Sequence, residues 1–220
     1  MGDFWEVLVR YLPDFASGFF VTCQLVAVSF LIAMGVGTLV AALRVQPLRG
    51  LKLVGGIYVE IFRNVPLLVL VIIFAAGLRR AGFDIPPFAA GTAALGLYTA
   101  AYVAESIRSG VFAVGQGQIE ASLSLGFTYP QTLRRIVLPQ ALRTVIPPLG
   151  NLIIAMIKNS AVIGATLSLA QDLLKEARLI NNKTNLTNES FFWAAVGYLL
   201  LTVTATIIVR RLETKLAIRR

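Results

Sequence analysis

The chain has 220 residues, of which 57% are hydrophobic and 14% are charged, and its mean hydropathy is +0.77. An ordinary soluble domain is about 25% charged, so this composition predicts an integral membrane protein with a single transmembrane domain over residues 1–220. The chain contains no histidine, which excludes histidine metal ligands and histidine proton relays. Its single cysteine, Cys23, excludes an intramolecular disulfide. The net charge of +9 does not indicate nucleic-acid binding, because the basic residues stand at the ends of apolar segments.

Five apolar segments are long enough to cross a membrane, since a spanning helix needs about 20 mainly apolar residues. They are residues 19–43, 57–78, 88–110, 144–167 and 191–210. The first segment is too long for the apolar part of a signal peptide, and the residues before it are mixed and acidic, so no cleaved signal is expected. The second and third segments carry charged residues near one end, which leaves their apolar parts free to cross. The predicted fold class is therefore all-α, an integral membrane protein with five transmembrane helices.

Lys and Arg are distributed unequally between the two sides of these predicted spans. With the N-terminus outside, the inner side carries Arg44, Arg49, Lys52, Arg63, Arg108, Arg134, Arg135, Arg143, Arg210, Arg211, Lys215, Arg219 and Arg220. The outer side then carries Arg10, Arg79, Arg80, Lys175, Arg178 and Lys183. Lys158 lies within the fourth span. Because cytoplasmic connections carry the excess of Lys and Arg, we predict an external N-terminus, a cytoplasmic C-terminus and a cytoplasmic loop over residues 111–143.

The first half of this loop contains a helix followed by a helix stop. Residues 120–125, EASLSL, favour a helix. Ala121 and Ser122 are small enough to let another surface approach closely. Gly126 is suited to ending this helix, because glycine adopts the left-handed conformation at little steric cost.

The second half of the loop contains the signals of another short helix. Thr128 and Gln131 form a capping-box pattern, and Pro130 is tolerated in the first turn that follows. The apolar side chains of this helix are Leu133, Ile136 and Val137. Pro139 is expected to end or kink it before the fourth span. The sequence therefore predicts a helix-turn-helix elbow at the membrane surface, rigid enough to transmit a movement.

Seven positions of this elbow resemble the cytoplasmic "EAA" loop of ABC-importer permeases, whose pattern is E-A-A-x3-G-x9-I-x-L-P. Six of them match, namely Glu120, Ala121, Gly126, Ile136, Leu138 and Pro139, and Ser122 stands where the family usually has alanine. The resemblance implies that the first helix docks in a groove of a separate ATPase, that the glycine shapes the turn and that Glu120 makes polar contacts there. Without the resemblance, the residues also fit an interfacial amphipathic helix-turn-helix that has no partner.

Other segments resemble the permeases of polar amino-acid importers. They are FRNVPLL at 62–68, AAYVAESIRSG at 100–110, LPQALR at 138–143 and KNS at 158–160, and the likeness extends from about residue 18 to residue 212. It implies the type I ABC-importer permease fold in a bacterial inner membrane. It also implies an ABC ATPase dimer, a second permease that is identical or related, an extracytoplasmic solute-binding protein and an amino-acid substrate. The chain has no G-x-x-x-x-G-K-[ST] sequence, so ATP would be bound by the partner and no cofactor or metal is expected here.

Two groups of polar residues are candidates for the substrate path. Lys158 lies well inside the fourth predicted span, where a lysine facing lipid costs about 2.5–3.5 kcal/mol, so it should face protein, water or the interface. Either Lys158, Asn159 and Ser160 line the central cavity, or Lys158 extends outward to the interface. Arg63 and Asn64 either contribute to the path or anchor and cap the helix. Pro66, which follows them closely, predicts a kink or a helix start, because it removes a backbone donor.

The charge of these candidates bears on the solute. In the resembling family, permeases for cationic amino acids often have an acidic residue at the position of Asn159. A neutral residue beside Lys158 favours an acidic or polar amino acid such as glutamate or glutamine. The alternative function is a secondary transporter of small polar solutes, which should carry inverted repeats or a proton carrier within the membrane.

Overall fold

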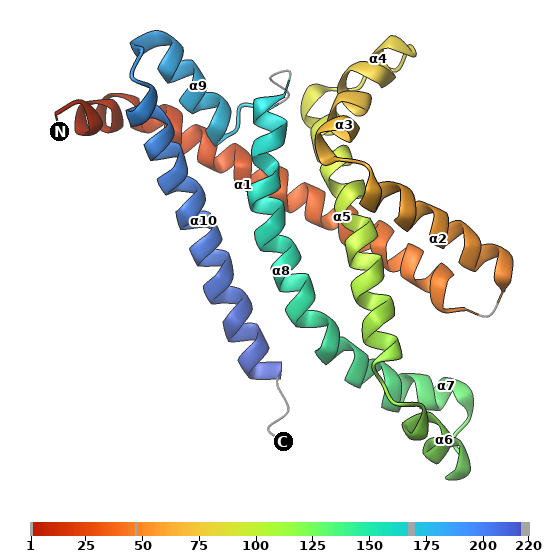
Figure 1. Cartoon of the computed structure of the whole chain (residues 1–220). Helices are drawn as coiled ribbons and strands as arrows, with labels where there is room; N and C mark the ends of the chain where they lie inside the picture. The colour runs from red at the N-terminus through yellow and green to blue at the C-terminus, as the bar shows by residue number, and fades with distance from the viewer. Residues whose placement is uncertain (1, 47, 167–169, 217–220) are drawn as a thin grey trace.

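The computed structural model describes residues 2–46, 48–166 and 170–216, and in these ranges every regular element is a helix (Figure 1). The elements are α1 (Gly2–Val45), α2 (Arg49–Asn64), α3 (Leu67–Ile72), the π-helical turn η1 (Ile73–Gly77), α4 (Leu78–Arg80), α5 (Pro87–Phe112), α6 (Gln116–Ser124), α7 (Tyr129–Thr132), the π-helical turn η2 (Leu133–Val137), α8 (Leu138–Ala165), α9 (Leu173–Thr184) and α10 (Thr187–Leu216). The predicted all-α fold class is confirmed. Residue 167 of the fourth predicted span and two basic residues of the orientation count, Arg219 and Arg220, lie outside the described residues.

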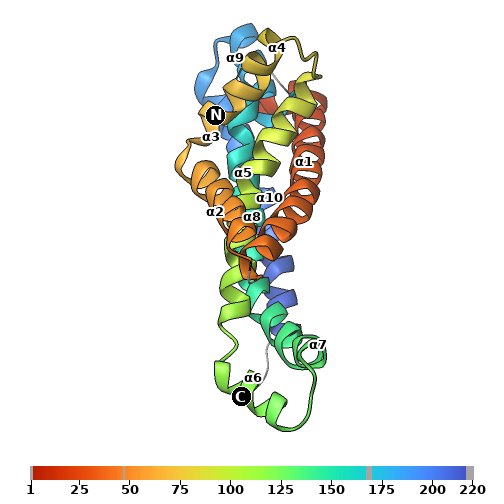
Figure 2. The same ribbon diagram turned by 90° about the vertical axis from the view of Figure 1, so that its right-hand side faces the viewer.

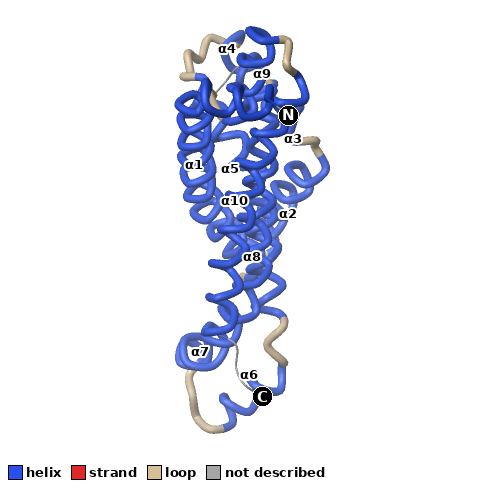
Figure 3. The backbone as a smooth tube through the Cα atoms, turned by 90° about the vertical axis from the view of Figure 1, so that its left-hand side faces the viewer, coloured by secondary structure: helices blue, strands red, loops and turns tan. Residues whose placement is uncertain are grey.

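The helices form a bundle with two distinct ends. In Figure 1 the N-terminus, α4 and α9 lie toward one end, whereas α6, α7 and the last turn of α10 lie toward the other. Figure 2 shows that α6 and α7 project beyond the bundle, and Figure 3 shows that the loops gather mainly at the two ends. The loop segment 111–143 and the C-terminal half of α10 are therefore on the same side of the molecule.

The bundle is centred on α5, which packs against α1, α2, α3 and α8. Small residues let these helices approach closely. A Cβ added at Gly96 of α5 would lie 2.7 Å from Ile32 of α1, and one added at Gly37 of α1 would lie 2.7 Å from Val103. The core between them includes Leu25 and Leu95, both fully buried. Close backbone approach through small residues is the usual packing mode of transmembrane helices.

Three described helices are long and apolar enough to cross a membrane: Phe4–Val45, Tyr129–Ala165 and Thr187–Lys215. The pair Arg49–Asn64 and Leu67–Arg80 meets the same criteria jointly. The helix α5 coincides with the third predicted span but is not among them. Its many Ala, Gly, Thr and Tyr residues lower its hydropathy, which fits its position at the centre of the bundle.

The second predicted span, 57–78, is not one helix. The helix begins earlier, at Arg49, and the chain bends by 101° between α2 and α3. Val65 is extended at φ −86° and ψ 129°, as expected for a residue that precedes proline. Pro66 lacks the N–H that would continue the helix, so the break predicted at this proline is present.

The sequence predicts that Pro139 either ends or kinks the helix of the elbow, and the first of these alternatives is wrong. The chain stays helical from Tyr129 to Ala165, and Pro139 lies in the first turn of α8. The wide turn η2 immediately precedes this proline, with the N–H of Leu138 donating to the carbonyl of Leu133, five residues back. A π-helical turn loosens the ladder in which an interior proline would otherwise clash. The elbow therefore continues directly into a spanning helix.

Candidate coupling elbow and substrate path

The turn between α6 and α7 has the geometry that the sequence predicts. Gly126, the second residue after the end of α6, adopts a φ of +84°. Its N–H donates to the Leu123 carbonyl at 3.0 Å, and the N–H of Phe127 donates to the Ser122 carbonyl at 3.1 Å. These two bonds are those of a Schellman motif, which satisfies the carbonyls left free at a helix end. The positive φ explains why this position favours glycine.

The start of α7 is fixed by a side chain and by a contact across the elbow. The Thr128–Gln131 capping box is present, and the N–H of Thr128 donates to Gln131 Oε1 at 2.9 Å. Across the turn, the hydroxyls of Ser122 and Thr132 lie 2.8 Å apart and are buried. This bond joins α6 to α7, which continues without a break into η2 and α8.

The outer surface of the elbow is a mixture of polar and apolar side chains. Glu120 and Ala121 are exposed, whereas Ser122 is buried. Leu125 is 78% exposed, one of the most exposed large apolar side chains of the described residues. Sequence reasoning missed this residue, because leucine inside EASLSL is read as an ordinary helix former. Exposed apolar surface beside polar residues is typical of a surface that binds another protein.

The last three matched positions of the EAA-like pattern lie away from this surface, on the helix that leads into the membrane. Ile136 is half-buried, and Leu138 and Pro139 are exposed. Their neighbour Val137 packs with Val114 and Ala141 in a small core beneath the elbow. These positions therefore belong to the connection between the elbow and α8.

The candidate path residues of the KNS segment separate into three environments. Lys158 is exposed. Asn159 lines a cavity of about 180 Å³ together with Tyr98 and Tyr102 of α5. Ser160 is fully buried, and its hydroxyl donates to the Ile157 carbonyl at 2.7 Å. Consecutive residues of a helix point in directions about 100° apart, so the three side chains cannot share one wall.

The other candidates, Arg63 and Asn64, are exposed residues of the last turn of α2. The Arg63 guanidinium lies over the ring of Tyr102, 5.4 Å from its centroid. The Asn64 amide donates back to the Glu60 carbonyl of its own helix at 2.7 Å. The structure thus brings Arg63 toward the tyrosine that also lines the Asn159 cavity, and it bonds the Asn64 side chain to α2.

Two tyrosines that sequence reasoning overlooked join these groups. Tyr98 and Tyr102 are one turn apart on α5, with hydroxyls separated by 3.1 Å. Both lie beside Asn159, so amide, phenol and guanidinium groups meet within a largely apolar bundle. The available signal was the i, i+4 spacing of two tyrosines within an otherwise apolar helix.

An ion-pair network closes the end of α5 that is nearer the elbow. Arg108 donates to Glu105 at 2.5 Å, as the i, i+3 spacing of the two residues predicts. The other carboxylate oxygen of Glu105 binds Arg44 at the end of α1. The sequence alone did not indicate that Arg44 pairs with Glu105, because the two residues are 61 positions apart. The network ties α1 to α5 on the side where α6 and α7 project.

A buried carboxylate organises the opposite end of the bundle. Asp172 caps α9 by accepting from the N–H of Lys175 at 2.9 Å, and it also accepts from the Tyr198 hydroxyl at 3.2 Å. Gly164 of α8 packs directly against this carboxylate. Burial of Asp172, outside the helices that can cross a membrane, raises the pKa of its carboxyl to about 6.

Residues 24–218 match the protein family described as "Binding-protein-dependent transport system inner membrane component". The chain belongs to this family. It is accordingly a multi-pass membrane permease of an ABC importer, in which a separate subunit hydrolyses ATP and a binding protein delivers the solute. Family membership decides against the alternative of a secondary transporter.

Relatives of this permease align over almost its whole length. It is 39% identical over 211 residues to the probable glutamine ABC transporter permease protein GlnM of Bacillus subtilis strain 168, covering 96% of this chain and 97% of the relative. It is 37% identical over 221 residues to the glutamate transport system permease protein GluC of Corynebacterium efficiens, covering 94% and 96%.

Solved structures agree with the fold of the permease. A crystal structure of an amino acid ABC transporter with histidines superposes with a TM-score of 0.89 at 35% identity, covering 94% of this chain and 96% of that one. An inward-facing structure of the MetNI methionine ABC transporter has a TM-score of 0.71 at 22% identity, with coverage of 96% and 97%. The permease therefore has the type I ABC-importer fold predicted from its sequence.

Proposed function

We propose that this permease imports a neutral or acidic polar amino acid, such as glutamine or glutamate. The observation that carries the proposal is the meeting of Asn159, Tyr98 and Tyr102 at one cavity, with Arg63 over the nearer tyrosine. An amide and a phenol can hydrogen-bond an amino acid's polar groups, and a guanidinium can pair with its carboxylate. The relatives named for glutamine and glutamate support the same class of solute.

Within this proposal the path residues have different roles. Asn159 and Arg63 contact the passing solute, with Tyr98 and Tyr102 as the wall between them. Ser160 keeps α8 in register, because its hydroxyl is engaged with its own helix. Lys158 is exposed and contributes to the path only through its charge, and Asn64 is held to its own helix by a side-chain hydrogen bond.

Uptake into proteoliposomes tests the solute. The complete transporter is supplied with labelled glutamine, glutamate or arginine and with its binding protein. We expect the first two to be carried and arginine to be rejected. Asn159→Asp places a carboxylate in the cavity and should reduce glutamate uptake at least tenfold. The control Asn151→Asp, an exposed position eight residues earlier on α8, should not. Preferred uptake of arginine by the unaltered permease contradicts the proposal.

We further propose that α6 and the Gly126 turn form the docking element for the ATPase, with Glu120 and Leu125 at the contact. The exposed Glu120 supplies polar contacts and the exposed Leu125 supplies apolar area. Because α7 continues through η2 into α8, a displacement of the elbow reaches Asn159 along one helix. Closure of two ATPases would thus move two elbows and reorient the paths of two permeases, identical or related.

Co-purification tests this docking. Glu120→Lys reverses a charge at the proposed contact and should release the ATPase while membrane insertion persists. Asp84→Lys makes the same change in the exposed loop between α4 and α5, at the other end of the bundle, and should retain it. Equal recovery of the ATPase with both variants contradicts the docking site.

The proposed orientation places the N-terminus outside and both the elbow and the C-terminus in the cytoplasm. It is supported by the excess of Lys and Arg on the elbow side. A cysteine introduced at Gln118 of α6, after Cys23→Ser, should react with a membrane-impermeant thiol reagent only in inside-out vesicles. A cysteine at exposed Asn182 of α9 should react only in right-side-out vesicles. The reverse pattern would refute this topology and the location of the ATPase with it.

A further inference from the structure

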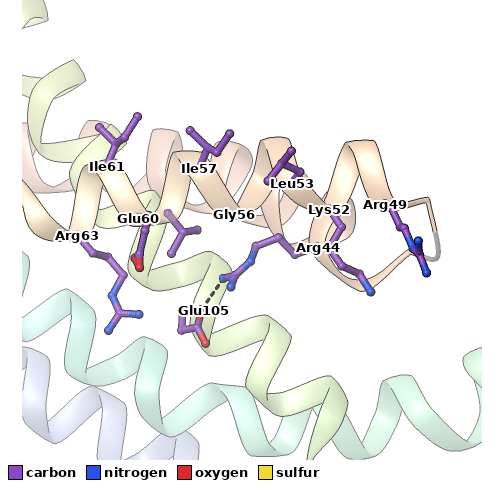
Figure 4. A pocket seen from close by; sticks show the side chains of 11 residues that line it. Arg44, Arg49, Lys52, Leu53, Gly56, Ile57, Glu60, Ile61, Arg63 and Glu105 are labelled. Carbon is purple, nitrogen blue, oxygen red and sulfur yellow. Dashed lines mark hydrogen bonds and ion pairs between the residues drawn. The ribbon is translucent and has the colours of Figure 1, made fainter.

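A second cavity, of about 770 Å³, lies on the outside of the bundle where α1 ends and α2 begins. Its walls come from Arg44, from α2 and from Glu105 of α5 (Figure 4). It is distinct from the cavity of Asn159, because the two share no lining residue. Its far end, near the end of α2, is lined by Glu60 and by Arg63, which is also part of the proposed solute path.

The charge of this cavity is positive at the end formed by the first turn of α2. Arg44, Arg49 and Lys52 all line this end. Glu105 is engaged by Arg44 and by Arg108 together, so it does not neutralise the other two. Among the described residues, neither Arg49 nor Lys52 takes part in an ion pair, and both are exposed. Two free cations therefore face the cavity beside a third that is held in place.

An apolar stripe runs along α2 beside these cations. Leu53, Ile57 and Ile61 are spaced by four residues and are 64%, 50% and 51% exposed. Figure 4 shows their side chains in a row along the helix, with Arg44 and Lys52 below the row. Gly56 leaves room between the two, since a Cβ added there would meet nothing within 4 Å. Cations next to a long aliphatic stripe match an amphiphile that has an anionic head and apolar tails.

We propose that this cavity binds an anionic phospholipid of the inner leaflet, with the phosphate at Arg49 and Lys52 and an acyl chain along Leu53, Ile57 and Ile61. Basic pockets at the cytoplasmic ends of membrane helices are suited to such headgroups. The assignment rests on the proposed orientation, which places the start of α2 at the cytoplasmic face. A free phosphate ion has no apolar part that could contact the stripe. A second copy of this face would place its cations against Arg49 and Lys52, and like charges repel.

The bound lipid would stabilise the position of α2. This helix contacts α1 and α5, where Gly55 packs against the Arg44 side chain, but its opposite side is the exposed stripe. The chain bends by 101° immediately after α2, so the helices that follow α2 do not cover the exposed stripe. An acyl chain there removes apolar area from water or from loosely packed lipid.

Native mass spectrometry of the complete transporter in detergent tests the site, with dioleoyl phosphatidylglycerol as the probe and dioleoyl phosphatidylcholine for comparison. The double variant Arg49→Gln, Lys52→Gln should bind phosphatidylglycerol about 30-fold more weakly, which corresponds to about 2 kcal/mol at about 1.4 kcal/mol per tenfold. The control Arg210→Gln, Arg211→Gln removes two exposed charges near the cytoplasmic end of α10 and should bind as the unaltered protein does.

A second pair of variants tests the volume of the cavity without changing its charge. Gly56→Leu should fill the cavity and weaken phosphatidylglycerol binding at least tenfold. Gly50→Leu makes the same change on α2, also with open space at Cβ but outside the cavity lining, and should have no effect. Because the readout is a count of bound lipids, it does not depend on which solute is transported or on ATPase coupling.

Three results would overturn the proposal. Equal affinity of the Arg49 and Lys52 double variant and the unaltered protein removes the headgroup site. Displacement of phosphatidylglycerol by millimolar inorganic phosphate identifies a free-anion site instead. Disulfide cross-linking of two permeases through Ile57→Cys, in a Cys23→Ser background, shows that a second copy covers the stripe.

Discussion

Replacing Gly126 tests whether the positive φ of the elbow matters for coupling. A Cβ added there would meet nothing within 4 Å, so steric overlap with other parts of the chain contributes nothing. The cost of Gly126→Ala is the left-handed conformation alone, about 1–2 kcal/mol. If the ATPase binds the elbow in this conformation, its affinity should fall about 5- to 30-fold. Asparagine tolerates the same conformation better than alanine does, so Gly126→Asn should lose less.

The assay is ATP hydrolysis by the reconstituted transporter as a function of ATPase concentration, with and without the loaded binding protein. Gly82→Ala is the matched control, because Gly82 also has a positive φ, +92°, and open space at Cβ, but lies between α4 and α5 at the other end of the bundle. Alanine there should carry the same conformational cost and should not reduce the affinity for the ATPase. An unchanged affinity for Gly126→Ala, or an equal loss for alanine and asparagine, would refute the reasoning from φ.

Other predictions concern the packing and titration of particular residues. Gly164→Ala would place a Cβ in the space of the Asp172 carboxylate and should destabilise the permease by about 1–3 kcal/mol, lowering its melting temperature by several degrees in a thermal-shift assay. Gly35→Ala, where a Cβ meets nothing within 4 Å, should leave that temperature unchanged. The pKa of Asp172 is about 6 in the folded protein against an ordinary 3.8, so the folded state binds the proton more tightly and stability should fall as pH rises from about 4 to about 6. Asp172→Asn should reduce that slope in melting curves recorded across this range, and an unchanged slope would contradict the assignment. Ser122→Ala removes the hydrogen bond to Thr132 and should cost about 1 kcal/mol by chemical denaturation. It should leave ATPase coupling intact, since alanine is usual at this position of the EAA pattern, and a complete loss of coupling would show that the hydroxyl itself is required.

Features set by local preference were predictable without a structure. The turn at Gly126, the capping box at Thr128 and the break at Pro66 are present as expected. Each of these features depends on the backbone angles that one residue allows, or on a hydrogen bond between residues close together in the sequence. The helix does not end at Pro139, which was one of the two predicted outcomes, because the π-helical turn before it lies outside the rules that describe a regular α-helix.

The composition of the candidate path was only partly predictable. Three consecutive polar residues, a lysine, an asparagine and a serine, indicated contact with a polar solute. Because α8 is apolar on most sides, its sequence does not show which of its faces is turned toward the solute path. Packing against α5 turns Asn159 toward Tyr98 and leaves Ser160 bonded to its own helix. A periodic pattern identifies a face only when the remaining faces differ from it in polarity.

The sequence by itself determined that this protein is a helical membrane protein with a helix-turn-helix elbow, because hydropathy and short-range conformational preference depend on neighbouring residues, and its motifs showed the resemblance to ABC-importer permeases. Only the tertiary structure decided which distant groups meet, such as Arg44 with Glu105 and Gly164 with Asp172. Those contacts depend on how helices rotate and cross in the bundle. Close packing of small residues governs that arrangement, and their spacing along one helix does not show which other helix they meet.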